Sequence, residues 1–173
     1  VAISGGSISV DESGVVTFQP ALNFYGATSA SYTVSDNNGA VSNVATISIT
    51  VNAVNDPPIA QNDIVSSDEG EVVTLNIVAN DFDFDSSINP ATVDLNTSVA
   101  GIQSSRTTAA GTFTVNSSGV LTYTPATNFS GLATITYTVA DVQGATSNQG
   151  TISISVNSIN SPPVANNDIV STN

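Results

Sequence analysis

Apolar and polar side chains alternate along short segments of this sequence. Five segments have an apolar residue at every second position: 73–77, 113–115, 121–123, 135–139 and 152–156. Gly, Asn, Asp and Ser separate the segments, and alternation over such short runs is typical of half-buried antiparallel strands. No segment shows a helical period. The pattern therefore predicts an all-β chain.

The two ends of the chain are copies of one another. A shift of 105 residues aligns residues 1–68 with residues 106–173 without a gap, and 34 of the 68 aligned positions are identical. Chance does not produce this identity over such a length. The chain is therefore a window on a tandem array of similar units.

Two Pro-Pro pairs, at 57–58 and 162–163, mark the boundaries of the units. Proline restricts its own φ and the residue before it to extended conformations, so each pair predicts a stiff linker. Residues 57–161 then form a complete unit of about seven strands, which indicates a β-sandwich. Residues 1–56 are expected to be the C-terminal part of a preceding sandwich, and residues 162–173 the start of the next. We expect the early strands of the first sandwich to lie before Val1 or to come from a neighbouring molecule.

The composition excludes several classes of function. The 173 residues include fourteen acids and a single base, Arg106, for a formal net charge of −13, and there is no Cys, His, Lys, Met or Trp. Catalysis by Cys or His and metal centres built on thiolate or imidazole cannot occur within this chain. One Arg cannot form a nucleic-acid footprint. The apolar runs are far shorter than the roughly 20 residues of a membrane span, so no membrane insertion is predicted.

The acids gather at the start of the complete unit. Eight of them lie between positions 56 and 85: Asp56, Asp63, Asp68, Glu69, Glu71, Asp81, Asp83 and Asp85. In an extended loop, the last three would point to the same side. Two carboxylates at 4 Å repel by about 1 kcal/mol even in water, and no base is nearby. Either the loops splay into solvent, as in a solvated acidic surface, or a hard divalent cation gathers them.

Calcium fits this set of donors. Ca²⁺ takes about 6–8 oxygen ligands from carboxylates, amide carbonyls, backbone and water, whereas zinc and copper prefer nitrogen or sulfur. The loop is not an EF-hand, because Ser86 stands where the sharp-turn glycine belongs and Thr92 where the bidentate Glu belongs. The linker acid Asp56 and the acids that follow it favour calcium over the solvated loop. Asp56 becomes Ser161 at the next linker, so that junction is expected to bind fewer ions or to bind them more weakly.

Several strings of residues resemble one known family. They are Val54-Asn55-Asp56-Pro57-Pro58, Ala79-Asn80-Asp81-Phe82-Asp83-Phe84-Asp85, Asn128-Phe129-Ser130-Gly131 and Tyr137-Thr138-Val139-Ala140-Asp141. Together they resemble the cadherin-like, VCBS-type (bacterial Ig-like) tandem repeats of giant secreted bacterial surface adhesins of the RTX type. The resemblance implies tandem antiparallel Ig- or cadherin-like β-sandwiches in a linear array. It also implies Ca²⁺ binding, export by type I secretion and a place at the bacterial cell surface.

The resemblance also implies where the ions bind. In cadherins the linker, the D-x-D loop and the Asp after the penultimate strand converge at the junction between domains. On this sequence the implied ligands are Asn55, Asp56, Asp63, Glu69, Asp81, Asp83, Asp85 and Asp141. The polar corner Asn128–Gly131 stands where cadherins carry an acidic motif, which argues against a full three-ion junction. The implied partners are neighbouring repeats, with a cell-surface or glycan ligand held by other domains.

We therefore expect a Ca²⁺-rigidified spacer repeat of an extracellular adhesin or surface fibre, with no enzymatic activity. Paired carboxylates can hydrolyse glycosides, but these acids lie at a linker and a small sandwich offers little cleft. Two alternatives remain. A carbohydrate-binding sandwich normally needs an exposed aromatic platform, for which only Tyr25, Phe82 and Phe84 lie off the predicted core. The second alternative is a filament in which a strand of one subunit completes the sandwich of another.

Overall fold

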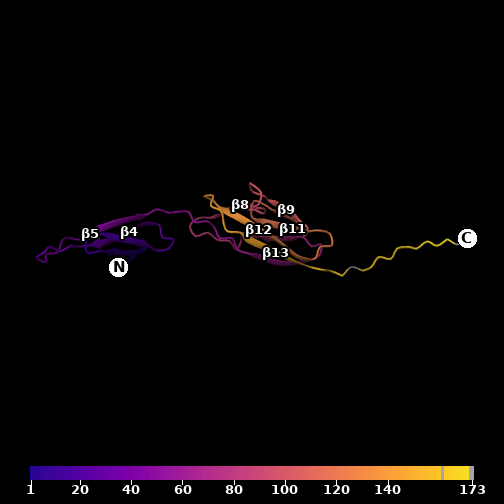
Figure 1. Cartoon of the computed structure of the whole chain (residues 1–173), viewed down its shortest axis with the longest axis horizontal. Coiled ribbons are helices and arrows are strands. Elements are labelled where there is room, and N and C mark those ends of the chain that lie inside the picture. Colours follow the sequence, from indigo (N-terminus) through magenta and orange to yellow (C-terminus); the bar gives the residue numbers. More distant parts are fainter. Residues whose placement is uncertain (161, 172–173) are drawn as a thin grey trace. The chain divides into compact units, whose positions relative to one another are not determined.

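The chain folds into two compact units, Val1–Asp56 (unit 1) and Pro57–Asn173 (unit 2). The computed structural model describes residues 1–160 and 162–171, and every regular element in this part of the chain is a β-strand (Figure 1). This confirms the all-β class predicted from the alternation. The described residues include no helix long and apolar enough to cross a membrane.

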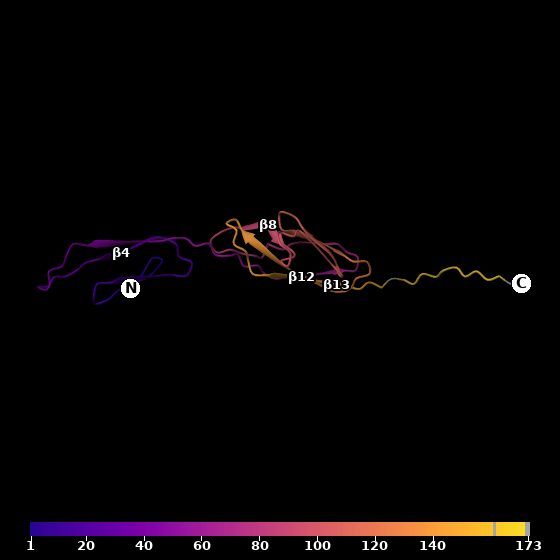
Figure 2. The same cartoon turned by 45° about the horizontal axis from the view of Figure 1, so that its top comes forward.

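Unit 2 is a sandwich of two four-stranded sheets. Its strands are β6 (Asp63–Asp68), β7 (Val73–Asn76), β8 (Ile88–Asp94), β9 (Ser105–Thr108), β10 (Gly111–Val115), β11 (Val120–Pro125), β12 (Gly131–Asp141) and β13 (Gly150–Asn157). One sheet has the order β7-β11-β10-β9 and the other the order β6-β13-β12-β8. Figure 2 shows β8, β12 and β13 of the second sheet.

One strand pair departs from the antiparallel pattern. β6 runs parallel to β13, with Asp63 opposite Ile152 and Asn157 opposite Asp68. All other strand pairs in unit 2 are antiparallel. The first strand of the unit therefore lies against the last strand, which places the start of unit 2 beside residues that are almost 90 positions later in the chain.

The core consists of the alternating apolar positions of both sheets. Phe113 and Leu121 from one sheet and Ile152 and Ile154 from the other are fully buried. Phe113 lies opposite Tyr123 across the β10–β11 pair, with ring centroids 4.6 Å apart. A buried Tyr needs a partner for its hydroxyl, and the Tyr123 hydroxyl donates a hydrogen bond to the Ala110 carbonyl at 2.6 Å.

Unit 1 contains only the later strands of this architecture. They are β1 (Ala2–Ile3), β2 (Gly6–Val10) and β3 (Val16–Pro20) in one sheet, and β4 (Gly26–Tyr32) paired with β5 (Ala45–Val51) in the other. The 105-residue shift matches them to β9 through β13. Val16 and Tyr32 are 41% and 47% exposed, whereas their counterparts Leu121 and Tyr137 are fully buried. Among the described residues, no counterparts of β6, β7 and β8 cover the apolar positions of unit 1.

The two Asn-Phe corners have the same backbone geometry. Asn23 and Asn128 adopt positive φ angles of 58° and 60°, a left-handed conformation that Asn tolerates better than most residues. The turn brings Phe129 against the hydrophobic core, half-buried. In unit 2 the corner thus adds the Phe129 ring to the periphery of the hydrophobic core.

A matched pair of substitutions tests this difference between the two cores. Ile154→Ala should lower the free energy of unfolding of unit 2 by about 2–5 kcal/mol, because it opens a cavity in a packed core. Ile49→Ala, at the equivalent position of unit 1, should cost unit 1 less, because Ile49 is only half-buried. Hydrogen exchange at the amides of β13 and β5 measures the two losses separately. Equal losses would contradict the difference in packing.

Candidate functional site

Two carboxylates from distant positions meet at the start of unit 2. Asp63 begins β6 and is only 7% exposed. Its Oδ1 accepts a hydrogen bond from the Asn80 side-chain amide at 3.2 Å, while its buried Oδ2 has no hydrogen-bond partner among the described residues. Burial, and to a smaller extent the negative charge of Asp81, raises the pKa of Asp63 to about 6. The site thus strongly disfavours a bare negative charge on Asp63.

Asp81 follows β7 and contacts the backbone at the start of unit 2. Its Oδ1 accepts hydrogen bonds from the Gln61 amide at 2.7 Å and from the Tyr137 hydroxyl at 2.9 Å. Burial raises the pKa of Asp81, and these two hydrogen bonds oppose that rise. The Asp81 carboxylate is therefore fixed in place between the main chain and the core.

The Tyr137 hydroxyl has more hydrogen-bond acceptors around it than its single proton can bond. Both oxygens of Asp81 and the carbonyl oxygens of Gln61 and Ile77 are within 2.9–3.0 Å of it. Burial, together with the hydrogen bond and charge of Asp81, raises the pKa of Tyr137 well above its usual value. The hydroxyl therefore keeps its one proton and donates to one oxygen at a time. The oxygens around this hydroxyl therefore form a cluster of hydrogen-bond acceptors at this end of unit 2.

The D-x-D-x-D loop partly follows the predicted alternation. Asp81, Asp83 and Asp85 are half-buried, whereas Phe82 and Phe84 are 39% and 59% exposed. The two Phe rings meet edge to face with centroids 5.2 Å apart. The loop does not stay extended. Asp83 Oδ1 accepts the backbone N–H groups of Asp85 and the next residue at 3.0 and 2.7 Å, which closes a tight turn.

A second buried carboxylate oxygen lies in this turn. Asp83 Oδ2 and the Ser86 hydroxyl are both buried, and neither has a hydrogen-bond partner among the described residues. The loop is attached to the segment that follows the linker, because the backbones of Ile59 and Phe82 exchange hydrogen bonds at 2.8 and 3.2 Å. The backbone of Ser87 also accepts a hydrogen bond from Val142 at 2.9 Å, which brings the loop to the end of β12.

Asp141 has a structural role that the sequence analysis did not identify. It is 2% exposed, and its Oδ1 accepts the backbone N–H groups of Gln143 and Ala145 at 2.8 and 2.9 Å. In unit 1 the Oδ1 of Asp36 accepts the equivalent amides at 2.8 and 2.9 Å. The repeated Asp before an x-x-Gly-Ala turn was a signal for this role, because an Asp side chain commonly caps the amides of a turn that follows it.

Glu69 lies away from the other predicted ligands. Its backbone N–H donates to the Asn157 carbonyl at 2.8 Å, where β13 ends. The length of β6, six residues at about 3.3 Å each, puts Glu69 roughly 20 Å from Asp63. Glu69 and Asp63 therefore cannot share one ion. Asn55 and Asp56, also predicted ligands, are half-buried at the C-terminal end of unit 1.

The structure assembles a smaller set of donors than the sequence analysis expected. Within residues 1–160 and 162–171, no three acidic side chains form a group that could by itself hold a metal ion. The charges of Asp63 and Asp81 interact, and the Asn80 side chain and the Gln61 carbonyl adjoin these two acids. The two carboxylates and the Gln61 carbonyl offer hard oxygen atoms, and the Asn80 amide lies beside the Asp63 carboxylate. They fit a calcium ion that completes its shell with water and main-chain oxygens.

Comparison with known proteins gives one family match. The family model described as "Bacterial Ig domain" matches residues 1–50 and 55–155. No curated protein matches the chain.

Several solved structures are similar to this chain. Chicken VE-cadherin EC1-2 is 20% identical with a TM-score of 0.45, over 89% of this chain and 81% of that one. The Protocadherin GammaB4 extracellular domain is 16% identical with a TM-score of 0.39, over 88% and 29%. Domains 4 and 5 of the S-layer protein SbsC are 16% identical with a TM-score of 0.35, over 91% and 92%. At these TM-scores the likeness says nothing about what this chain binds.

The pKa of Asp63 predicts how the stability of metal-free unit 2 depends on pH. Folding raises this pKa from 3.8 to about 6, so the folded state binds the proton more tightly than the unfolded state. The contribution of Asp63 to the free energy of unfolding should therefore be largest below pH 4 and should be lost as the pH rises to about 6. Asp63→Asn should remove most of this loss. Chemical unfolding in EDTA across this range measures it, and an identical pH profile for both proteins would contradict the assignment.

Proposed function

The chain belongs to the bacterial Ig domain family, and from this premise we propose that it is a spacer repeat of an extracellular adhesin-type protein, rigidified by Ca²⁺. The family match agrees with the resemblance seen in the sequence, and domains of this kind are typically surface-exposed structural modules. The tandem units support a role in extending a chain of domains. Neighbouring repeats are then the direct partners, and adhesion is carried by other domains.

The observation that carries the calcium proposal is the pair of buried carboxylate oxygens, Asp63 Oδ2 and Asp83 Oδ2, that lack hydrogen-bond partners among the described residues. A buried acceptor without a partner costs about 1–3 kcal/mol, and more if it is charged. The chain cannot supply the missing charge, because its single base, Arg106, donates to the Leu95 carbonyl at 3.2 Å. Cations from solution would satisfy these oxygens.

Asp63 and Asp81 are the proposed first ligands. The Asp81 carboxylate is already oriented by Gln61 and Tyr137, so binding an ion there costs little side-chain entropy. Asp83 and Asp85 in the following turn, and the linker pair Asn55-Asp56, are the proposed additional ligands. Glu69, at the other end of β6, is proposed to serve the following junction. Asp141 is proposed to contribute to the same site as the loop while it holds its own turn.

The proposed mechanical effect follows from the connections of the loop. Ile59 and Phe82 are paired through their backbones, and the Gln61 amide bonds to Asp81, so an ion held by the loop also restrains the segment that starts at Pro57. Without the ion, like charges near the linker repel one another. With it, the linker has fewer accessible conformations. The net charge of −13 adds self-repulsion, which favours an extended array and discourages lateral aggregation.

Calcium should therefore stabilise unit 2 through Asp63. Replacing EDTA by millimolar Ca²⁺ should raise the unfolding temperature of the wild-type chain by several degrees, because the ion binds the folded state only. Asp63→Asn should lose most of this rise and should weaken binding in isothermal titration calorimetry by at least about tenfold. Glu12→Gln is the matched control, since it removes one negative charge from an exposed position of unit 1 and should leave the response intact.

The mechanical part of the proposal has its own measurement. Small-angle scattering of the same chain should give a longer maximum dimension in Ca²⁺ than in EDTA, and Asp63→Asn should abolish the difference. A wild-type chain that shows neither the thermal nor the scattering response would overturn the function proposed here. An equal response in wild type and Asp63→Asn would overturn the assignment of Asp63 alone.

A further inference from the structure

The first and last strands of unit 2 lie side by side and run in the same direction. β6 and β13 pair in parallel over six residues, from Asp63 opposite Ile152 to Asp68 opposite Asn157. The chain enters this pair at the Asp63 end and leaves it at the Asn157 end. The points at which the main chain passes into and out of the sandwich are therefore at opposite ends of one strand pair.

This arrangement determines how a stretching force acts on unit 2. Tension on the linker draws β6 toward its N-terminal end, and tension on the segment that follows β13 draws β13 toward its C-terminal end. Because the strands are parallel, the two pulls are opposed along one axis and slide the strands past each other. The hydrogen bonds run between the strands, so they share the force and must break together. In an antiparallel pair of first and last strands, the same pulls would act at one end and open the bonds one after another.

Side chains lengthen this contact at the end where the chain enters. The Asn148 side chain accepts a hydrogen bond from the Ala60 amide at 3.0 Å and donates one to the Ala60 carbonyl at 2.9 Å, so it pairs with the main chain as a strand residue would. Ala60 is only 5% exposed. The Asn62 side chain accepts the Thr151 amide at 2.9 Å. The contact with the last strand and the residues before it thus begins at Ala60, ahead of β6.

The contact is also lengthened at the end where the chain leaves. The backbone N–H of Glu69 donates to the Asn157 carbonyl at 2.8 Å, one residue beyond the end of β6. The Asn157 side chain donates to Asp68 Oδ1 at 3.1 Å. The ends of a paired element open at the lowest free energy. Here both ends have hydrogen bonds in addition to those of the strands themselves.

Packing holds β6 against the same displacement. Val65 lies opposite Ile154 and is half-buried against the hydrophobic core, whereas the adjacent Ile64 is 84% exposed. Because the side chains of a strand alternate between its two faces, β6 cannot slide by one residue without turning Val65 out to solvent and Ile64 inward. The core therefore resists the sliding of β6 along β13, as the hydrogen bonds do.

We propose that unit 2 transmits tension along the chain through the β6–β13 pair, and that Asn148 secures this pair at the end where tension enters. The origin of the tension, a pull along an array of repeats, rests on the proposed function. The resistance itself rests only on the strand pairing and on the side chains at its ends. Main-chain and amide groups make these bonds without an ion, so the resistance should persist in EDTA.

Two pulling directions on the full chain test the proposal by single-molecule force spectroscopy. The sequence has no cysteine, so pairs of introduced cysteines can carry the handles. Ala53→Cys with Ser158→Cys, both at exposed positions, loads β6 and β13 in shear. Ala53→Cys with Thr146→Cys, also exposed, pulls at one end of the pair and peels the strands apart. In EDTA the rupture force in shear should exceed the peeling force by about twofold or more, because the interstrand bonds then break together.

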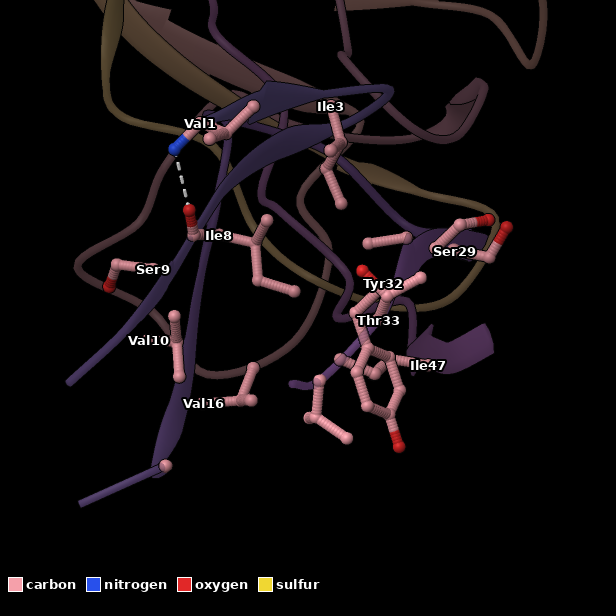
Figure 3. Close-up of a pocket in the computed structure, with 14 residues that line it drawn as sticks. Val1, Ile3, Ile8, Ser9, Val10, Val16, Ser29, Tyr32, Thr33 and Ile47 are labelled. Carbon is pink, nitrogen blue, oxygen red and sulfur yellow. Dashed lines mark hydrogen bonds between the residues drawn. The ribbon is translucent and has the colours of Figure 1, made fainter. Parts of the chain in front are cut away.

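Both pairs of handles leave the strands of unit 1 outside the stretched segment. Val16, Tyr32 and Ile47 of unit 1 line an open pocket (Figure 3), and the opening of that unit would otherwise add a separate event to the record. Every rupture between the handles then belongs to unit 2. The two pairs share the handle at Ala53, so the bonds between residues 57–62 and the D-x-D-x-D loop are loaded in both directions.

A matched pair of substitutions tests the role of Asn148. Asn148→Ala removes both bonds to Ala60, and Asn148→Asp keeps only the acceptor for its amide. Thr92→Ala is the control, since the Thr92 hydroxyl donates to the Asn89 carbonyl at 2.7 Å and accepts the Ala140 amide at 2.8 Å, away from β6 and β13. Forced unfolding follows the unfolding rate and not the equilibrium stability. All three variants should lower the unfolding temperature, whereas only the Asn148 variants should lower the rupture force in shear, and Asn148→Ala should lower it more.

The same measurements can overturn the proposal. Equal rupture forces in the two pulling directions would show that the parallel pair does not bear the tension. A force that falls equally in Asn148→Ala and Thr92→Ala would show that resistance follows overall stability, and would end the assignment to Asn148. The proposed function is tested by the thermal and scattering responses to Ca²⁺, whereas the strand pair is tested by pulling direction in EDTA, so each can fail without the other.

Discussion

The parallel pairing of β6 with β13 is the contact on which the complete unit depends. It closes the edge of the second sheet and joins the start of the unit to its last strand. It also carries Asp63 into the interior, where the carboxylate meets the charge of Asp81. The same pairing therefore completes the core and brings two repelling carboxylates together at the end of the sandwich. Unit 1, which has no such strand among the described residues, leaves Tyr32 half-exposed.

The acids of the chain differ in whether the protein itself satisfies their carboxylate oxygens. Asp141 and Asp36 are satisfied by backbone amides and hold turns. Asp63 and Asp83 each keep one buried oxygen without a partner in the described part of the chain, and the single base of the sequence is engaged at Leu95. A protein of this composition can neutralise such oxygens only with protons or with ions from its environment. The stability of the protein therefore depends on the pH and on the cations of the surrounding solution.

The sequence predicted the repeat and the apolar strands, because each has a periodic signal. It did not reveal β6 as a parallel partner of β13, since the inward positions of β6 are Asp63, Val65 and Ser67 and show no apolar alternation. Of the predicted ligands, Asp63 and Asp81 lie close enough for their charges to interact, and the binding of an ion by these acids stays a prediction. Proximity in sequence could not show that Glu69 lies at the opposite end of the same strand. That separation is set by the direction of β6, which is a property of the tertiary fold.

The position of Arg106 has a consequence for resistance to proteolysis. It is the only residue of this sequence after which a trypsin-like protease can cut. It lies within β9, opposite Phe113 of β10, and its guanidinium is tied to the Leu95 carbonyl. A protease needs an unpaired, extended substrate, so this bond becomes cleavable only when the edge of the sheet has opened. The rate of cleavage by a trypsin-like protease is thus set by how often β9 unfolds locally, and not by how often the protease collides with the chain.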